Sequence, residues 1–229
     1  MRNVHITASE EYRRARAELL AAERDLRDAT ARVANARAAL PPGPRVDGSS
    51  PLTTATGKPT TLSALFDEHE SLLVYHMMFD EGWRQPCPMC AMWIDGIDAL
   101  VPQLTERTAV AVLAPAKPSQ LAEAAKRRDW RWIRLVSTQP GELTDQLGLR
   151  IGEHGDGLEP ALTCFVRDVD GVRVHWHGRV GLHDPAGEDD YRPADGLDTR
   201  GIDAYCAVWA LFDLLPAGRG DWYASRQTR

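Results

Sequence analysis

Two cysteines three residues apart are the part of this sequence best suited to chemistry. Cys87 and Cys90 enclose Pro88 and Met89, shortly after an apolar run and at the start of a segment of helical composition. A cysteine at the N-terminus of a helix faces unpaired backbone N–H groups and the positive end of the helix dipole, and both favour the thiolate. We therefore expect the pKa of Cys87 to lie below its usual value of about 8.5. Cys90, one turn further along the same face, is then the partner that closes a disulfide.

Metal binding is the alternative chemistry for this cysteine pair. A C-x2-C pair is half of a zinc site, and thiolates with methionine thioethers suit Cu(I). The sequence holds no second C-x2-C pair, because Cys164 and Cys206 stand alone in apolar segments. The histidines available as further ligands are His76, His175 and His177. A non-catalytic zinc or copper protein therefore stays open beside the redox interpretation, for which no cofactor is expected.

The histidines have structural interpretations as well. His76 lies inside the apolar run LLVYHMMF, where most histidines are core residues, and a proton relay beneath the dithiol is the functional alternative. His175 and His177 alternate along an expected strand and so share one side of it. A packing or solvated role is expected for both.

Composition limits the class of protein. The 229 residues are 43% hydrophobic and 26% charged, which is typical of a globular chain. The net charge of −6 argues against nucleic acid or an anionic membrane as the main partner. No apolar run approaches the roughly 18–20 residues of a membrane span, and the N-terminus lacks the apolar core of a secretory signal. We expect a cytoplasmic protein.

The elements that position the cysteines alternate in type. Expected strands are 72–79, 108–114, 133–137, 161–167 and 172–177, and expected helices are 62–68, 90–104, 119–128, 141–147 and 202–215. Parallel strands joined by helices, followed by a hairpin at Asp170-Gly171, predict an α/β fold with a mixed sheet flanked by helices. Residues 41–60, rich in Pro, Gly, Ser and Thr, are expected to form a linker or an irregular lead-in to the domain, and no role follows for loop 178–200.

A long helix is expected ahead of this domain. Residues 9–40 contain no Gly or Pro, and apolar residues recur there at alternating steps of three and four, as in a coiled-coil seam. The helix either docks on its own domain or pairs with a second subunit, and we expect a homodimer through it. The domains are then 1–45, an arm and linker, and 46–229, the α/β domain with its C-terminal helix.

The chain resembles the bacterial thioredoxin-like family known as domain of unknown function 899, a relative of the peroxiredoxins. The pieces that carry the resemblance are SEEYRRARAELLAAE, YHMMF, PCPMC, DWRWIRLVST, FVRDVDGVRVHWHG and WALFDLLPAGRGDWY, in this order. The resemblance implies a thioredoxin-like fold and dithiol–disulfide oxidoreduction. It also implies that Pro160 is a cis-proline packed against the dithiol and aligns a protein or small-molecule disulfide substrate.

Other residues around the motif bear on the substrate. Trp83 and Met89 are expected to line an apolar groove beside the cysteines. Arg84 stands where peroxiredoxins place a threonine three residues before the reactive cysteine, which weakens a peroxidase interpretation. The Pro-Met dipeptide between the cysteines differs from that of thioredoxin, so the redox poise also differs.

Overall fold

The apolar run before the cysteine motif forms strand β4 (Ser71–His76), inside an eight-stranded sheet of a computed structural model. β4 pairs in parallel with β5 (Ala109–Ala114), and β5 pairs in parallel with β6 (Arg134–Ser137). On its other side β4 is antiparallel to β9 (Ala161–Asp168), which forms a hairpin with β10 (Gly171–Arg179). All six residues of β5 are buried, as expected for a strand covered on both faces.

The described residues are 8–151, 157–179 and 201–224. They divide between two compact units, Met1–Pro41 and Pro42–Arg229, and the sheet belongs to the second. Within the described residues, no helix is long and apolar enough to cross a membrane. The loop expected at 178–200 falls, from residue 180 on, outside the described residues.

Three short strands lie where we expected a linker, so that expectation for 41–60 is wrong. They are β1 (Arg45–Val46), β2 (Pro51–Thr54) and β3 (Pro59–Thr61). β2 and β3 form a hairpin whose turn uses Gly57 at φ +82°, and β2 also pairs with β6. Threonines are well suited to such strands. β1 and β2 also have partners far away in the sequence, which are β10 and β6. The full order of the sheet is β1-β10-β9-β4-β5-β6-β2-β3.

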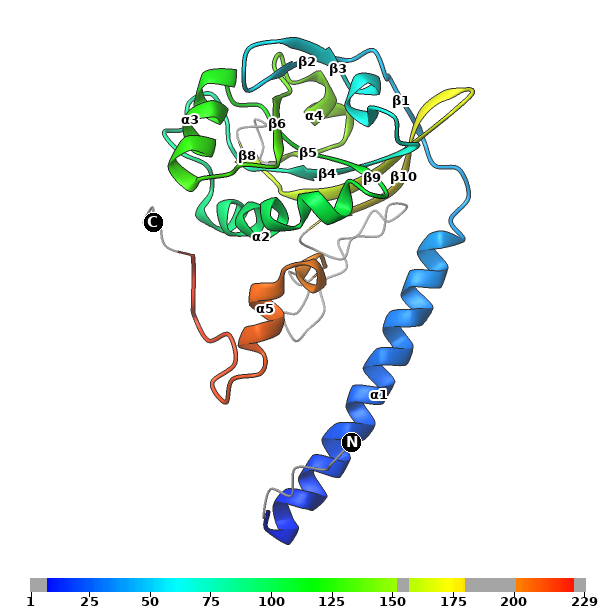
Figure 1. Cartoon of the computed structure of the whole chain (residues 1–229), viewed down its shortest axis with the longest axis vertical. Helices are drawn as coiled ribbons and strands as arrows, with labels where there is room; N and C mark the ends of the chain where they lie inside the picture. Colours follow the sequence, from blue (N-terminus) through cyan, green and yellow to red (C-terminus); the bar gives the residue numbers. More distant parts are fainter. Residues whose placement is uncertain (1–7, 152–156, 180–200, 225–229) are drawn as a thin grey trace. The chain divides into compact units, whose positions relative to one another are not determined.

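Helices cover both faces of the sheet (Figure 1). The helices α2 (Pro88–Leu104) and α3 (Pro118–Arg128) pack on the face that carries Tyr75 and Val112. The 3-10 helix η1 (Ser63–Phe66) and helix α4 (Glu142–Gln146) pack on the opposite face, against Val74 and Leu113. A second, two-stranded sheet joins β7 (Arg150–Ile151) to β8 (Gly157–Leu158).

The C-terminal part of the domain differs from expectation. A single helix over 202–215 was expected, but the structure has the 3-10 helix η3 (Asp203–Tyr205) followed by a shorter helix α5 (Ala207–Phe212). The break falls at Cys206, whose backbone is extended (φ −109°, ψ 107°) and whose carbonyl accepts from the Trp209 amide. Both elements lie on the α2 side of the sheet (Figure 1).

The parallel β4–α2–β5 unit followed by the antiparallel β9–β10 hairpin is the arrangement of a thioredoxin-like fold. The expected α/β fold class is therefore confirmed. The cysteine pair lies at the start of α2, which is the next element after β4 in the chain.

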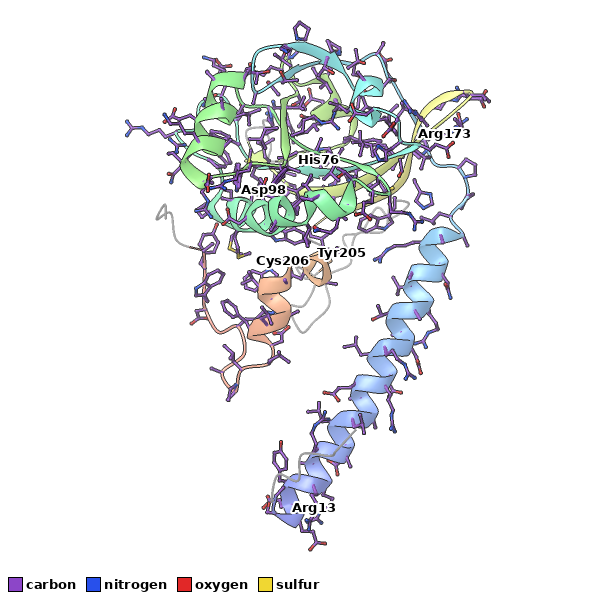
Figure 2. The ribbon with its side chains drawn as sticks, in the orientation of Figure 1. Arg13, His76, Asp98, Arg173, Tyr205 and Cys206 are labelled. Carbon is purple, nitrogen blue, oxygen red and sulfur yellow. The ribbon has the colours of Figure 1, made fainter. Side chains whose placement is uncertain are left out.

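A buried carboxylate fixes α2 in place. Asp98, on α2 and 8% exposed, accepts hydrogen bonds from the backbone N–H groups of Arg131, Trp132 and Ile133 at 2.8–3.1 Å (Figure 2). A carboxylate that accepts several backbone N–H groups offsets the cost of its burial. This contact ties α2 to the segment that leads into β6 and so holds the cysteine-bearing helix against the sheet.

The first unit contains helix α1 (Glu10–Ala38). Ser9 caps it, because its hydroxyl accepts from the Tyr12 amide at 3.1 Å. No residue of α1 is buried.

Candidate functional site

The two cysteines occupy the first turn of α2. Cys87 is the N-cap, and Pro88 follows at the first helical position, where its missing N–H leaves no bond unmade. The Cys87 amide donates to the Met78 carbonyl at 3.0 Å, and the Met78 amide donates to Cys90 Sγ at 3.4 Å. These two bonds join the exit of β4 to the start of α2 and place both sulfurs at one site.

The two thiols differ in acidity. The pKa of Cys87, which is partly buried, falls to about 5, chiefly because the Cys90 thiol hydrogen-bonds its sulfur. Burial opposes this fall, and the backbone N–H groups of Cys90 and Met89 and the Tyr223 hydroxyl add to it. Cys90 is 1% exposed, and its pKa is raised well above the usual range by burial and then by the neighbouring Cys87. The site thus holds one thiolate and one thiol at neutral pH.

A tyrosine lies beneath the dithiol. Tyr75 on β4 is buried, stacks on Trp93 of α2 with ring centroids 5.4 Å apart, and hydrogen-bonds Cys90. Burial, followed by the contacts with Cys90, raises its pKa well above its ordinary value, so it is a neutral hydroxyl. Sequence reasoning missed this residue, although the alternation of faces along β4 places it with Met77 on the α2 side.

An aromatic cluster holds the C-terminal segment. Trp222 packs edge-on against Trp209 and Phe212 of α5, at 5.7 and 4.9 Å between ring centroids. Arg219 lies over the Trp209 ring at 5.0 Å and is paired with two aspartates, Asp203 and Asp213. Pairing on both sides and contact with the ring fix this arginine and the turn that carries it.

The segment held in this way reaches the reactive cysteine. The Tyr223 hydroxyl lies 3.6 Å from Cys87 Sγ, and the Ala224 amide donates to Met89 Sδ at 3.3 Å. Tyr223 was also missed from the sequence, where the only signal is the density of aromatic residues in WALFDLLPAGRGDWY. The site is therefore built from β4, α2 and a segment more than a hundred residues further along the chain.

Two clefts open beside Cys87. The first, of about 600 Å³, contains both cysteines and the expected residues Met89 and Pro160, with aromatic walls that include Trp209 and Trp222. The second, of about 590 Å³, contains Cys87 and the expected Trp83. Tyr223 lines both clefts. The three residues expected to bind substrate therefore all lie in clefts that contain Cys87. Met89 and Pro160 line the first cleft, and Trp83 lines the second.

Pro160 differs from expectation in its peptide bond. Among the described residues the cis X–Pro bond is Gln139–Pro140, so the bond between Glu159 and Pro160 is trans and the cis expectation is wrong. The approach to β9 is fixed instead by Glu159, whose amide donates to the Leu149 carbonyl at 2.9 Å and whose carboxylate pairs with Arg179.

His76 and His177 lie away from the dithiol. His76 Nε2 and His177 Nδ1 both contact the hydroxyl of buried Thr163, at 2.9 and 2.8 Å. Burial lowers the pKa of His76 to about 3, helped by His177, and burial lowers that of His177 to about 4, helped by Arg179. Since side chains alternate along β4, His76 shares the face of Val74, opposite Tyr75, so a relay beneath the dithiol is wrong (Figure 2 labels His76).

The expected alternation of His175 and His177 is interrupted. A β-bulge between Val174 and Trp176 shifts the register, which puts Trp176 opposite Cys164 and His177 opposite Thr163. Over residues 8–151, 157–179 and 201–224, no three His, Cys, Asp or Glu side chains are grouped so that they could hold a metal.

Comparison with known proteins places this chain in a family. The model of the family described as "Bacterial protein of unknown function (DUF899)" matches residues 1–228. The chain belongs to the DUF899 family. No curated protein matches this chain.

Solved structures similar to this DUF899 chain include peroxiredoxins. A mutant of PrxQ from Xylella fastidiosa is 16% identical, with TM-score 0.49, over 61% of this chain and 86% of that chain. A peroxiredoxin Q mutant from Xanthomonas campestris is 18% identical, with TM-score 0.46, over 62% and 86%. Peroxidoxin BcpB from Mycobacterium tuberculosis is 20% identical, with TM-score 0.44, over 59% and 80%.

The contact between Tyr223 and Cys87 gives a prediction for this DUF899 protein. Alkylation of Cys87 by iodoacetamide should reach half its maximal rate near pH 5. Replacing Tyr223 with phenylalanine removes a donor to the thiolate, so the midpoint should rise by about one pH unit. Tyr205→Phe is the matched control, because that ring packs on Trp176 instead (Figure 2 labels Tyr205). An unchanged midpoint in Tyr223→Phe would show that the hydroxyl does not act on the sulfur.

Proposed function

We propose that this protein is a thiol–disulfide oxidoreductase in which Cys87 is the nucleophile and Cys90 the resolving cysteine. The observation that carries the proposal is the opposite shift of the two pKa values at one helix start, inside an open cleft. A low pKa makes Cys87 a thiolate at neutral pH, and the thiolate is the reactive form of cysteine. A high pKa keeps Cys90 protonated until the first step has taken place.

The reaction has two steps. The Cys87 thiolate attacks one sulfur of a substrate disulfide, whose S–S bond breaks, and the other substrate sulfur leaves as a thiolate. That thiolate takes the proton of Cys90, and Cys90 then attacks Cys87 Sγ and releases the second substrate sulfur. Two electrons have moved to the substrate, which leaves as one thiol and one thiolate, the latter taking its proton from water, and the protein ends with a Cys87–Cys90 disulfide. Another dithiol then reduces the protein, and no organic cofactor is required.

The substrate is a disulfide, of a protein or a small molecule, that presents apolar groups next to its sulfurs. Met89 and Pro160 line one approach to Cys87, and Trp83 lines the other. All four cysteines are free thiols, which suits work as a reductant in the cytoplasm.

A redox titration of the full chain tests the proposal. The protein is equilibrated with mixtures of reduced and oxidised dithiothreitol, and the Cys87–Cys90 disulfide is followed by alkylation and mass spectrometry. Reversible formation of this disulfide, together with reduction of insulin or of a small aromatic disulfide, is the expected result. A pair that never forms the disulfide, or zinc or copper that co-purifies and is lost in Cys87→Ser, would contradict it and favour the metal-binding alternative.

A further inference from the structure

Helix α1 carries an apolar seam that its own unit does not cover. The large apolar side chains Tyr12, Leu19, Leu26 and Val33 recur every seven residues, and none of them is buried. Leu26, near the middle of the helix, is 68% exposed. In water, most of the stability of a protein helix comes from packing of its apolar face. A helix of 29 residues with this seam therefore calls for a partner surface.

The other half of the seam is made of alanines. Three residues after each large side chain stands a small one, and these are Ala15, Ala22, Ala29 and Ala36. In heptad notation the large residues are all at position a and the alanines are all at position d. Such strict segregation of sizes decides how two copies of the helix can pack.

In a parallel pair, a faces a and d faces d. Layers with two large residues would then alternate with layers of two alanines, and the helices cannot keep one distance that suits both, because interaxial distance follows side-chain size. In an antiparallel pair, a faces d, so each layer between residues 19 and 36 combines one large residue with one alanine. Facing positions of unequal size interdigitate at a single spacing.

Charges beside the seam favour the same direction. A parallel pair brings Glu18 to the partner's Glu23 and Arg32 to the partner's Arg37, both like-charged, against one favourable pair between Glu11 and the partner's Arg16.

The antiparallel pair brings Asp25 to the partner's Arg32 twice, close to the centre. Its like-charged pair, Arg16 with the partner's Arg37, also occurs twice, but it lies at the exposed ends, where Arg16 already pairs with Glu23 at 2.9 Å.

We propose that two copies of this chain pair through α1 as an antiparallel helical dimer, with Leu26 packed on the partner's Ala29. The neighbouring layers are then Ala22 on the partner's Val33 and Leu19 on the partner's Ala36. The two-fold axis passes between residues 27 and 28, and the pairing is independent of the dithiol chemistry.

Distances between spin labels test the direction of pairing in the full chain. Labels are attached at Arg14→Cys or at Asp28→Cys in a Cys87→Ser background, and the unmodified background measures labelling of the remaining cysteines. With a rise of 1.5 Å per residue, the two residues 14 of an antiparallel pair lie about 40 Å apart along the axis, whereas the two residues 28 lie side by side. A short distance at both positions would mean a parallel pair and would overturn the proposal.

Charge substitutions test the seam itself. Leu26→Glu should weaken dimerisation by about 10²-fold or more in sedimentation, since two buried leucines are lost per dimer. Leu20→Glu is the matched control, because Leu20 follows the seam residue Leu19 on the same helix but lies outside the seam, and it should leave the dimer unchanged. A monomeric wild-type chain at micromolar concentration, or equal effects of the two substitutions, would also overturn the proposal.

Discussion

Replacing Cys87 with serine is expected to lower the rate of disulfide reduction by at least about 10³-fold. A serine hydroxyl stays protonated at neutral pH, whereas the pKa of Cys87 is about 5 and its sulfur is already a thiolate. Cys90 cannot replace it, since burial and the neighbouring sulfur hold the pKa of Cys90 high and only 1% of the residue is exposed. The measurement is the initial rate of reduction of an aromatic disulfide at neutral pH.

Cys164→Ser is the matched control for this substitution. Cys164 lies on β9, is partly buried, and has a pKa raised by burial, so its thiol is a poor nucleophile. The control should retain the wild-type rate. If Cys87→Ser retained its activity and Cys164→Ser lost it, the nucleophile would be a different thiol from the one at the start of α2.

The parts of the site that were predictable from sequence depend on neighbours in the chain. A continuous apolar run indicates a strand buried on both faces, and cysteine followed by proline indicates a helix start. Since α2 is the next element after β4 in the chain, these two signals place Cys87 and Cys90 after a buried strand and at the beginning of a helix. The hairpin of β9 and β10 was likewise indicated by one dipeptide, Asp170-Gly171.

The parts that were missed depend on contacts between distant residues. Tyr223 reaches Cys87 across 136 positions, through an aromatic cluster and the paired Arg219. No periodic pattern in the sequence predicts such a contact. Strands β1 and β2 were missed for the same reason, because their partners β10 and β6 lie far along the chain, and β3 pairs with β2.

Tyr75 and His76 are neighbours on β4, so their side chains point to opposite faces of the sheet. Only the one on the α2 face lies beneath the dithiol. The sequence drew attention to the histidine because of its residue type. The geometry of the strand places the tyrosine on the α2 side and the histidine with Thr163 on the other. A run that is apolar throughout leaves its two faces undistinguished in the sequence, so this assignment required the packing of α2.

Replacing Cys90 with serine is expected to stop the reaction after its first step. The Cys87 thiolate is still formed, although its pKa should rise because its main hydrogen-bond donor is altered. It attacks the substrate, but no second thiol is present to release the mixed disulfide. Turnover should fall by about 10²-fold or more, and a covalent adduct on Cys87 should accumulate, visible by mass spectrometry as the mass of half the substrate.

The pKa of Cys90 is expected to change between the two steps of the reaction. Part of the rise in the pKa of Cys90 comes from the Cys87 sulfur, through a hydrogen bond and through charge. When Cys87 becomes part of a mixed disulfide, its negative charge is gone, so the pKa of Cys90 should fall at the moment when Cys90 must react.

The Met78 amide and the Tyr75 hydroxyl both lower the pKa of Cys90, and both contacts remain available to its thiolate. Tyr75→Phe should therefore slow release of the mixed disulfide in the wild-type dithiol while the first attack keeps its rate.

For Cys90→Ser, an adduct that forms no faster than in Cys87→Ser would contradict attack by Cys87 followed by release through Cys90.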